Sequence, residues 1–162
     1  AGSGGAVRQK REIAAVLNIE PTALRVITLD DGGNFGTKNR VYVEFPLVLW
    51  ASRRVGRPVK YTCLRSEAFL TDYQGRDLLT TIELALDGEG KFLGLDAKVT
   101  VDAGAYSSYP FTACLEAAQV ASILPGPYNI PTFSCKTWSV ATNKCGILPY
   151  RGVARAGVCY TL

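Results

Sequence analysis

Residues 78–101 read LLTTIELALDGEGKFLGLDAKVTV and are the most secure structural signal in the chain. Apolar and polar residues alternate over Leu78–Leu86, as in a half-exposed strand. The segment 87–90, Asp-Gly-Glu-Gly, is a strong hairpin-turn sequence. Phe92–Val101 is then the return strand, so the sequence predicts a β-hairpin.

The segments on either side of the hairpin predict a mixture of helices and strands without regular βαβ alternation. Pro46 is acceptable in a helix only within the first turn, Gly56 ends that helix, and residues 124–127, Leu-Pro-Gly-Pro, break a later one. This order favours the α+β class, with a mixed sheet, a hairpin and packed helices. The expected helices are Ala6–Leu17, Val43–Val55 and Phe111–Ala121, with a helical turn at Ser66–Leu70; the expected strands are Leu24–Leu29, Val59–Cys63 and Phe133–Thr142; Asp102–Tyr106 is expected to be a loop.

Composition favours one globular domain over residues 1–162, or part of one, with a flexible terminus at 1–5. The chain has 162 residues, of which 48% are hydrophobic and 20% charged, enough for an ordinary core. The longest apolar run, 45–51, is too short to span a bilayer, and no signal-peptide region stands at the start. We therefore expect a cytoplasmic chain without a membrane partner. The five cysteines form no C-x-x-C pair, which suits reduced thiols.

Charge and histidine content exclude several kinds of site. The net charge is +4 and there is no histidine. Imidazole-based catalytic triads and zinc sites with histidine ligands are therefore excluded within this chain. A metal would arrive already chelated by an organic cofactor or be held partly by another chain. The basic residues lie mainly in the first half, but no aromatic-interleaved basic motif accompanies them, so nucleic acid is not the expected partner.

A glycine-bearing loop at 30–38, Asp-Asp-Gly-Gly-Asn-Phe-Gly-Thr-Lys, follows a predicted strand and is the best candidate for a cofactor cradle. Glycines permit positive φ and let backbone N–H groups approach a ligand. A tight turn without a ligand is the alternative. A nucleotide-phosphate loop is excluded, because Thr37 separates Gly36 from Lys38 and Asn39 stands where a magnesium-binding Ser or Thr belongs. A second glycine-containing loop with one arginine covers 144–152.

Several short motifs in order resemble one family, the molybdenum hydroxylases of xanthine dehydrogenase and aldehyde oxidase type. The resemblance covers nearly the whole chain and implies part of the large, molybdopterin-binding subunit. The motifs that carry it are Gly-Gly-x-Phe-Gly-x-Lys at 32–38, Gly-Arg-Pro-Val-Lys-Tyr at 56–61, Leu-Arg-Ser-Glu-Ala-Phe at 64–69, Gln-Gly-Arg-Asp at 74–77, Gly-Ala-Tyr at 104–106, Leu-Pro-Gly-Pro-Tyr at 124–128 and Pro-Tyr-Arg-Gly at 149–152.

The resemblance implies a molybdopterin cofactor, in simple or cytosine dinucleotide form, whose molybdenum is held by the pterin dithiolene and not directly by this chain. Backbone N–H groups around Gly33, Phe35 and Gly36 would donate to the molybdenum ligands, and Arg151 would approach from the other side. The implied reaction hydroxylates an aldehyde or heteroaromatic C–H carbon with oxygen from water. Electrons would pass to iron–sulfur clusters and FAD on partner chains or domains. The implied cofactor-binding residues are Gly32, Gly33, Asn34, Phe35, Gly36 and Arg151.

Departures from the family pattern bear on the substrate, for which Phe35, Asn39 and Val153 are the implied pocket residues. Asn34 replaces a glycine, and we expect it to tolerate a left-handed backbone. Asn39 stands where xanthine-oxidising members carry a substrate-binding glutamate, and Val153 where they carry a stacking aromatic ring. Gly152 replaces the copper-binding cysteine of the carbon monoxide enzymes. Xanthine and carbon monoxide are therefore disfavoured as substrates.

No catalytic residue is assigned within this chain. The family's general base is a glutamate on a segment absent from these 162 residues, as is a glutamine that contacts a molybdenum oxo ligand. Glu44, Glu67 and Glu116 are expected to be solvated or salt-bridged instead. The chain would thus be a fragment, a proteolytic core or one subunit of a divided enzyme, active only with its other segments. A non-catalytic scaffold that does not bind the cofactor is the alternative.

Overall fold

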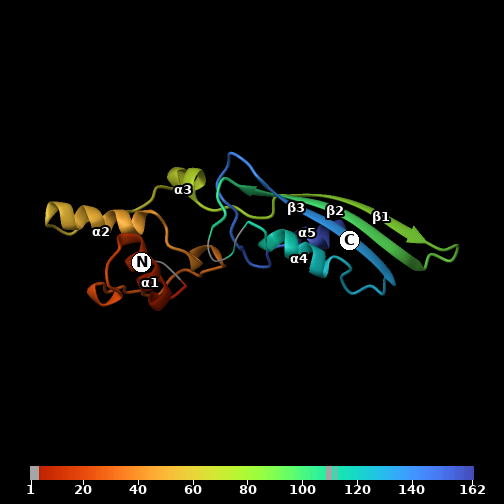
Figure 1. Ribbon diagram of the computed structural model, residues 1–162, viewed down its shortest axis with the longest axis horizontal. Coiled ribbons are helices and arrows are strands. Elements are labelled where there is room, and N and C mark those ends of the chain that lie inside the picture. The colour runs from red at the N-terminus through yellow and green to blue at the C-terminus, as the bar shows by residue number, and fades with distance from the viewer. Residues whose placement is uncertain (1–3, 109–110, 112) are drawn as a thin grey trace. The chain divides into compact units, whose positions relative to one another are not determined.

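The computed structural model describes residues 4–108, 111 and 113–162 (Figure 1). It contains two compact units, Ala1–Leu70 and Thr71–Leu162, which we call the N-terminal and C-terminal units. Residues 1–3 of the terminus that was expected to be flexible lie outside the described residues. Gly4, in the same segment, donates its N–H to the carbonyl of Lys38 over 3.0 Å.

The N-terminal unit is built on two helices, α1 (Ala6–Leu17) and α2 (Glu44–Val55), which pack against each other. Both confirm the helices expected from the sequence. Pro46 lies in the first turn of α2, where its missing N–H leaves no helical bond unmade. Gly56 ends the helix in the left-handed region, at φ 66°. Short 3-10 turns, η1 (Pro21–Ala23) and η2 (Thr37–Asn39), and helix α3 (Arg65–Thr71) complete the helical elements described before the sheet.

The strands expected at Leu24–Leu29 and Val59–Cys63 are wrong, because no strand is described over either range. Leu24 does have extended backbone, with φ −120° and ψ 134°. A ladder, however, requires a hydrogen-bonded neighbour, and the described part of the chain provides none for either segment. β-branched residues such as Val26 therefore predicted extension without predicting a sheet.

The C-terminal unit contains a three-stranded sheet in the order β1-β2-β3. β1 (Leu78–Leu86) and β2 (Phe92–Gly104) form the expected antiparallel hairpin, and β3 (Thr132–Ala141) pairs parallel to β2. The hairpin turn is fixed by the Asp87 carboxylate, which accepts the N–H groups of Glu89 at 3.0 Å and Lys91 at 2.8 Å. The sheet is thus mixed, as expected.

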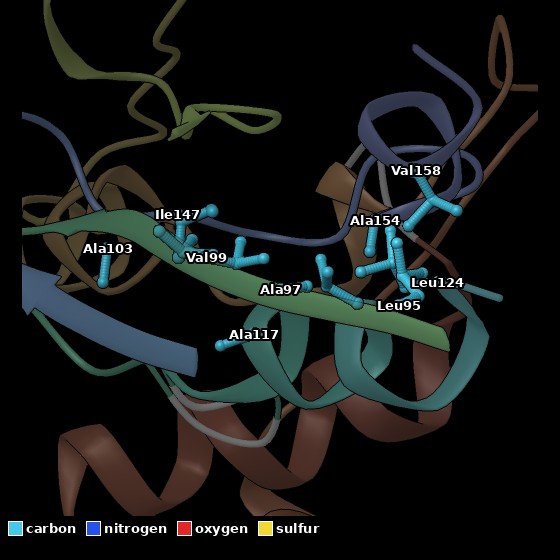
Figure 2. Packing of buried hydrophobic residues seen from close by; sticks show 11 residues of the cluster. Leu95, Ala97, Val99, Ala103, Ala117, Leu124, Ile147, Ala154 and Val158 are labelled. Carbon is cyan, nitrogen blue, oxygen red and sulfur yellow. The ribbon is translucent and has the colours of Figure 1, made fainter. Parts of the chain in front are cut away.

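A helical crossover joins the parallel strands, as parallel pairing requires. It contains α4 (Leu115–Ile123), which packs on β2 and β3, while α5 (Arg155–Thr161) packs on β1 and α4. Alternate β2 residues from Leu95 to Ala103 are buried, and they form one cluster with residues of both helices (Figure 2). The core of this unit therefore lies between one face of the sheet and its helices.

Two element boundaries differ from expectation. β2 continues to Gly104, so residues 102–104 are strand and not loop, because pairing with β3 extends that far. Helix α4 begins at Leu115 and not at Phe111; Thr112 within the expected range lies outside the described residues. Within the part of the chain that is described, no helix has the length and apolarity needed to cross a bilayer.

Candidate functional site

The glycine loop of the N-terminal unit is built on positive backbone angles. Gly33, Phe35 and Gly36 have φ values of 104°, 54° and 101°. Asn34 is not among the positive-φ residues, so the tolerance for a left-handed backbone expected of it is not called upon. Gly33 is required for space as well, because a Cβ there would lie 2.3 Å from Cε2 of the Phe35 ring. The glycines of this loop therefore serve both conformation and close packing.

Asn34 holds the loop together through its side chain. Its Oδ1 accepts the N–H of Gly36 at 2.7 Å, and its Nδ2 donates to Asn39 Oδ1 at 3.0 Å. Its backbone carbonyl accepts from the Thr37 hydroxyl at 3.4 Å. The Gly36 N–H is thus used inside the loop, and it is not an outward donor as the sequence led us to expect.

Other backbone donors of the loop remain available to a ligand. In the described structure, the consecutive N–H groups of Gly32, Gly33 and Asn34 donate to no acceptor. Gly32 is exposed, and Gly33 and Asn34 are half-buried. Successive backbone N–H groups that point to one side bind an anion or an oxo ligand. The donor set therefore fits the oxygen ligands of a molybdenum-pterin group.

The second loop, 144–152, is anchored to the segment before β1. Gln74 donates its N–H to the Gly146 carbonyl at 3.2 Å and accepts from the Leu148 N–H at 2.9 Å. Arg76 then donates through Nη2 to the backbone carbonyl of Arg151 at 2.6 Å. Its guanidinium also stacks 4.6 Å from the centre of the Tyr150 ring. Arg76 itself has φ 64°, so this residue is held in the left-handed region by its contacts.

Arg151 has a fixed backbone and an available side chain. Its carbonyl is held by Arg76, whereas its guanidinium is exposed and has no partner among the described residues. The following turn is strained, since Val153 has φ 50°, which is unusual for a β-branched side chain. The Val153 N–H donates to the Tyr150 carbonyl at 2.7 Å and closes that turn. The loop thus exposes the Arg151 guanidinium on a backbone that Arg76 holds in place.

A charged cluster fixes the start of the second loop. Lys144 contacts the Asp77 carboxylate, and its Nζ lies 3.3 Å from Asp102 Oδ2. Burial lowers the pKa of Lys144, but these two carboxylates outweigh it and raise the pKa overall. The Thr142 hydroxyl and the Gly104 N–H donate to Asp102 and lower its pKa. The cluster therefore remains charged and ties β2 to the loop.

Glu116 corrects the expectation that the internal glutamates are solvated or salt-bridged. It is only 3% exposed, on the face of α4 that also buries Val120, and its Oε1 has no hydrogen-bond partner in the described structure. Burial raises its pKa, opposed by the Arg76 backbone N–H and the Arg76 charge. Glu67 is exposed and accepts the Leu64 N–H at 2.8 Å, so it caps the start of α3. Glu44 is half-buried.

The residues expected at the site divide between the units. Asn34, Phe35 and Asn39 lie on the glycine loop of the N-terminal unit, whereas Arg151 and Val153 lie on the second loop of the C-terminal unit. Among the described residues, no group of His, Cys, Asp and Glu side chains could hold a metal ion. Sequence reasoning quoted Arg76 within the Gln-Gly-Arg-Asp motif at 74–77 but gave it no role.

Comparison with known proteins identifies the family of the chain. Residues 4–162 match the family model of the molybdopterin cofactor-binding domain. The chain is 34% identical over 148 residues to the 6-hydroxypseudooxynicotine dehydrogenase complex subunit gamma of Paenarthrobacter nicotinovorans, covering 90% of this chain and 18% of that protein. It is 33% identical to the nicotine 6-hydroxylase large subunit of the same organism, covering 87% of this chain and 17% of that protein.

Solved structures agree with these relatives. Quinoline 2-oxidoreductase from Pseudomonas putida 86 superposes with a TM-score of 0.83 at 36% identity, covering 90% of this chain and 18% of that one. The aldehyde oxidoreductase from Desulfovibrio gigas superposes with a TM-score of 0.74 at 28% identity, covering 94% of this chain and 16% of that one. The chain thus spans less than a fifth of the length of these relatives. It belongs to the molybdopterin cofactor-binding domain family of the molybdenum hydroxylases.

Proposed function

We propose that this chain forms part of the molybdopterin site of a large hydroxylase subunit. The observation that carries the proposal is the run of available backbone N–H groups at Gly32, Gly33 and Asn34, in a loop whose conformation is fixed from within. Donors that are held in place before the reaction stabilise developing negative charge with little reorganisation. The family match supports molybdopterin as the ligand of the domain that contains this loop.

Within this proposal, each loop has a separate task. The N–H groups of Gly32, Gly33 and Asn34 would hold the oxygen ligands of the cofactor, next to the Phe35 ring, which packs against Gly33. Arg151 would contribute a positive charge from the second loop, where the bond from Arg76 to the Arg151 carbonyl holds the backbone that carries this side chain. When bound, the molybdenum-pterin group supplies two-electron oxidation of a C–H carbon with oxygen derived from water. The general base and the remaining contacts come from other segments of the large subunit.

The proposed substrate is an aldehyde or a non-purine heteroaromatic compound. Asn39 lacks the carboxylate, and Val153 the aromatic ring, that would anchor a purine. A hydrogen bond to a charged group contributes about 1.5–3 kcal/mol, and an aromatic pair about 0.5–1.5 kcal/mol beyond area. We expect kcat/KM to favour benzaldehyde or nicotinate over xanthine by at least about tenfold. Steady-state kinetics on these compounds test this, and a clear preference for xanthine would refute it.

The proposed setting is a cytoplasmic complex with iron–sulfur and FAD partners. Two relatives are named as subunits of larger enzymes, which supports partner chains for this protein as well. No nucleic acid or membrane partner is part of the proposal.

The test is metal and pterin analysis of the complete large subunit, purified with its partners. We expect molybdenum and a fluorescent pterin derivative in equal amounts, and dye reduction with an aldehyde or a heteroaromatic substrate. A stable complex with neither molybdenum nor pterin would favour the alternative, a scaffold that keeps the fold without the cofactor.

A further inference from the structure

The Asn34–Asn39 pair has a fixed direction that the loop backbone dictates. A backbone N–H can only donate, so the Asn34 atom that lies 2.7 Å from the Gly36 nitrogen must be oxygen. The other end of the Asn34 amide is therefore the NH₂ group, and it donates to Asn39 over 3.0 Å. The atom of Asn39 that receives this bond must also be oxygen. The Gly36 N–H thus sets the orientation of both side-chain amides.

Gly4 covers the pair from one side. A Cβ at Gly4 would lie 2.2 Å from Asn39 Oδ1 and 2.6 Å from Asn34 Nδ2, so its backbone is in close contact with both amides. The Gly4 N–H is bonded to the Lys38 carbonyl at 3.0 Å, which holds this cover in place. Both asparagines are half-buried. The hydrogen bond between them is therefore shielded from competing water.

One consequence concerns the far end of Asn39. Its Oδ1 accepts a hydrogen bond from Asn34. In the described structure its Nδ2 donates to no residue, and it is not one of the fully buried polar atoms that lack a partner. The group that Asn39 can offer to a ligand is therefore a neutral hydrogen-bond donor. A carboxylate at this position would offer an acceptor instead.

We propose that Asn34 determines substrate specificity by turning the Asn39 amide so that its NH₂ group faces the substrate. This inference rests on the proposed function, in which Asn39 lines the substrate pocket. The site then selects a substrate that carries a hydrogen-bond acceptor, such as the ring nitrogen of a heteroaromatic compound, and rejects one that carries a ring N–H. Asn34 acts through Asn39 and is a positioning residue.

Two substitutions reverse the outward group by different routes. In Asn39→Asp, one carboxylate oxygen still accepts from Asn34 and the other faces outward as an acceptor. In Asn34→Asp, one oxygen keeps the Gly36 N–H and the other attracts the Asn39 NH₂ group, so the Asn39 amide turns and its oxygen faces outward. The second change reverses the polarity of the pocket without altering any group that touches the substrate.

The experiment measures dissociation constants of pyridine and pyrrole by calorimetry on the complete large subunit with its partners. Pyridine carries a ring acceptor and pyrrole a ring donor. We expect the wild type to prefer pyridine, and each variant to shift the pyridine-to-pyrrole ratio toward pyrrole by about tenfold. Asn18→Asp makes the same chemical change at the C-terminal end of α1 and should leave the ratio unchanged.

The outcomes separate this inference from the proposed function. A ratio that Asn39→Asp leaves unchanged would show that Asn39 does not face the ligand, and this outcome decides the matter even if Asn34→Asp fails to fold. A ratio that changes in Asn39→Asp but not in a folded Asn34→Asp would show that Asn34 does not set the orientation. Molybdenum and pterin are assayed on the same samples, and since binding needs no turnover, their absence would overturn the proposed function alone.

Discussion

Gly104→Ala should destabilise the C-terminal unit through two separable effects. Gly104 ends β2 with φ 71°, and a Cβ there would lie 2.2 Å from the Cys145 carbonyl oxygen and 2.7 Å from its carbonyl carbon. A left-handed backbone costs a non-glycine residue about 1–2 kcal/mol. The added Cβ would press on backbone atoms, so the Cys145 carbonyl would have to move by about 1 Å. Overpacking of this kind costs about a further 1–3 kcal/mol. We expect a total loss of about 2–5 kcal/mol.

Two other glycines of the same unit provide matched controls. Gly90 also has positive φ, at 80°, but nothing lies within 4 Å of its added Cβ, so Gly90→Ala isolates the backbone cost. Gly88 has neither feature, and Gly88→Ala should change stability by less than about 0.5 kcal/mol.

Urea unfolding of the wild type and the three variants measures these differences directly. The order of stability should be Gly88→Ala, then Gly90→Ala, then Gly104→Ala as the least stable. If Gly104→Ala lost no more stability than Gly90→Ala, the Cys145 carbonyl would not lie against Gly104 as described.

Three further predictions follow from the site. Burial raises the pKa of Glu116, so the free energy of unfolding should fall as pH rises from the ordinary carboxyl pKa through the raised one. Glu116→Gln should remove this pH dependence. If urea unfolding of Glu116→Gln showed the same pH profile as the wild type, the prediction would be contradicted. Gly36→Val in the complete subunit opposes a φ of 101° and should abolish molybdenum occupancy; normal occupancy and activity at an unchanged Tm would remove this loop from the cofactor site. The 162-residue chain alone should retain no molybdenum and reduce no dye with an aldehyde, whereas a rate that tracks its molybdenum content would show that its site is complete.

The fold was predictable where local sequence determines the structure. The β1–β2 hairpin carries its own turn residues, and Gly56 marks the end of α2 by a mechanism that acts within a few residues. The strands expected at 24–29 and 59–63 failed because a ladder depends on a neighbour that no local pattern specifies. The extension of β2 to Gly104 has the same cause, since pairing with a strand far along the chain decides where it ends.

The sequence predicted which loops to consider as the candidate site, but not the bonds within them. The glycine motif indicated the loop, but not that Asn34 would take the Gly36 N–H. Glu116 was expected to be solvated because glutamate is usually exposed. It is buried because it lies on the apolar face of α4, four residues before Val120. The role of Arg76 depends on Arg151, which lies in a distant segment, so only the folded structure could bring the two together.

The mixed pairing of β2 has a consequence for the order of folding. The β1–β2 hairpin joins neighbouring segments and can form in about 1–10 μs. β3 must first close the 105–131 crossover before it gains any contact with β2, and such non-local pairing is slower. The second loop follows β3 in the chain, and we predict that its bonds to Gln74 and Arg76 form after β3 has paired. Arg151 is therefore among the last groups of this unit to reach its native place, and mutations in the crossover should delay it more than mutations in the hairpin turn.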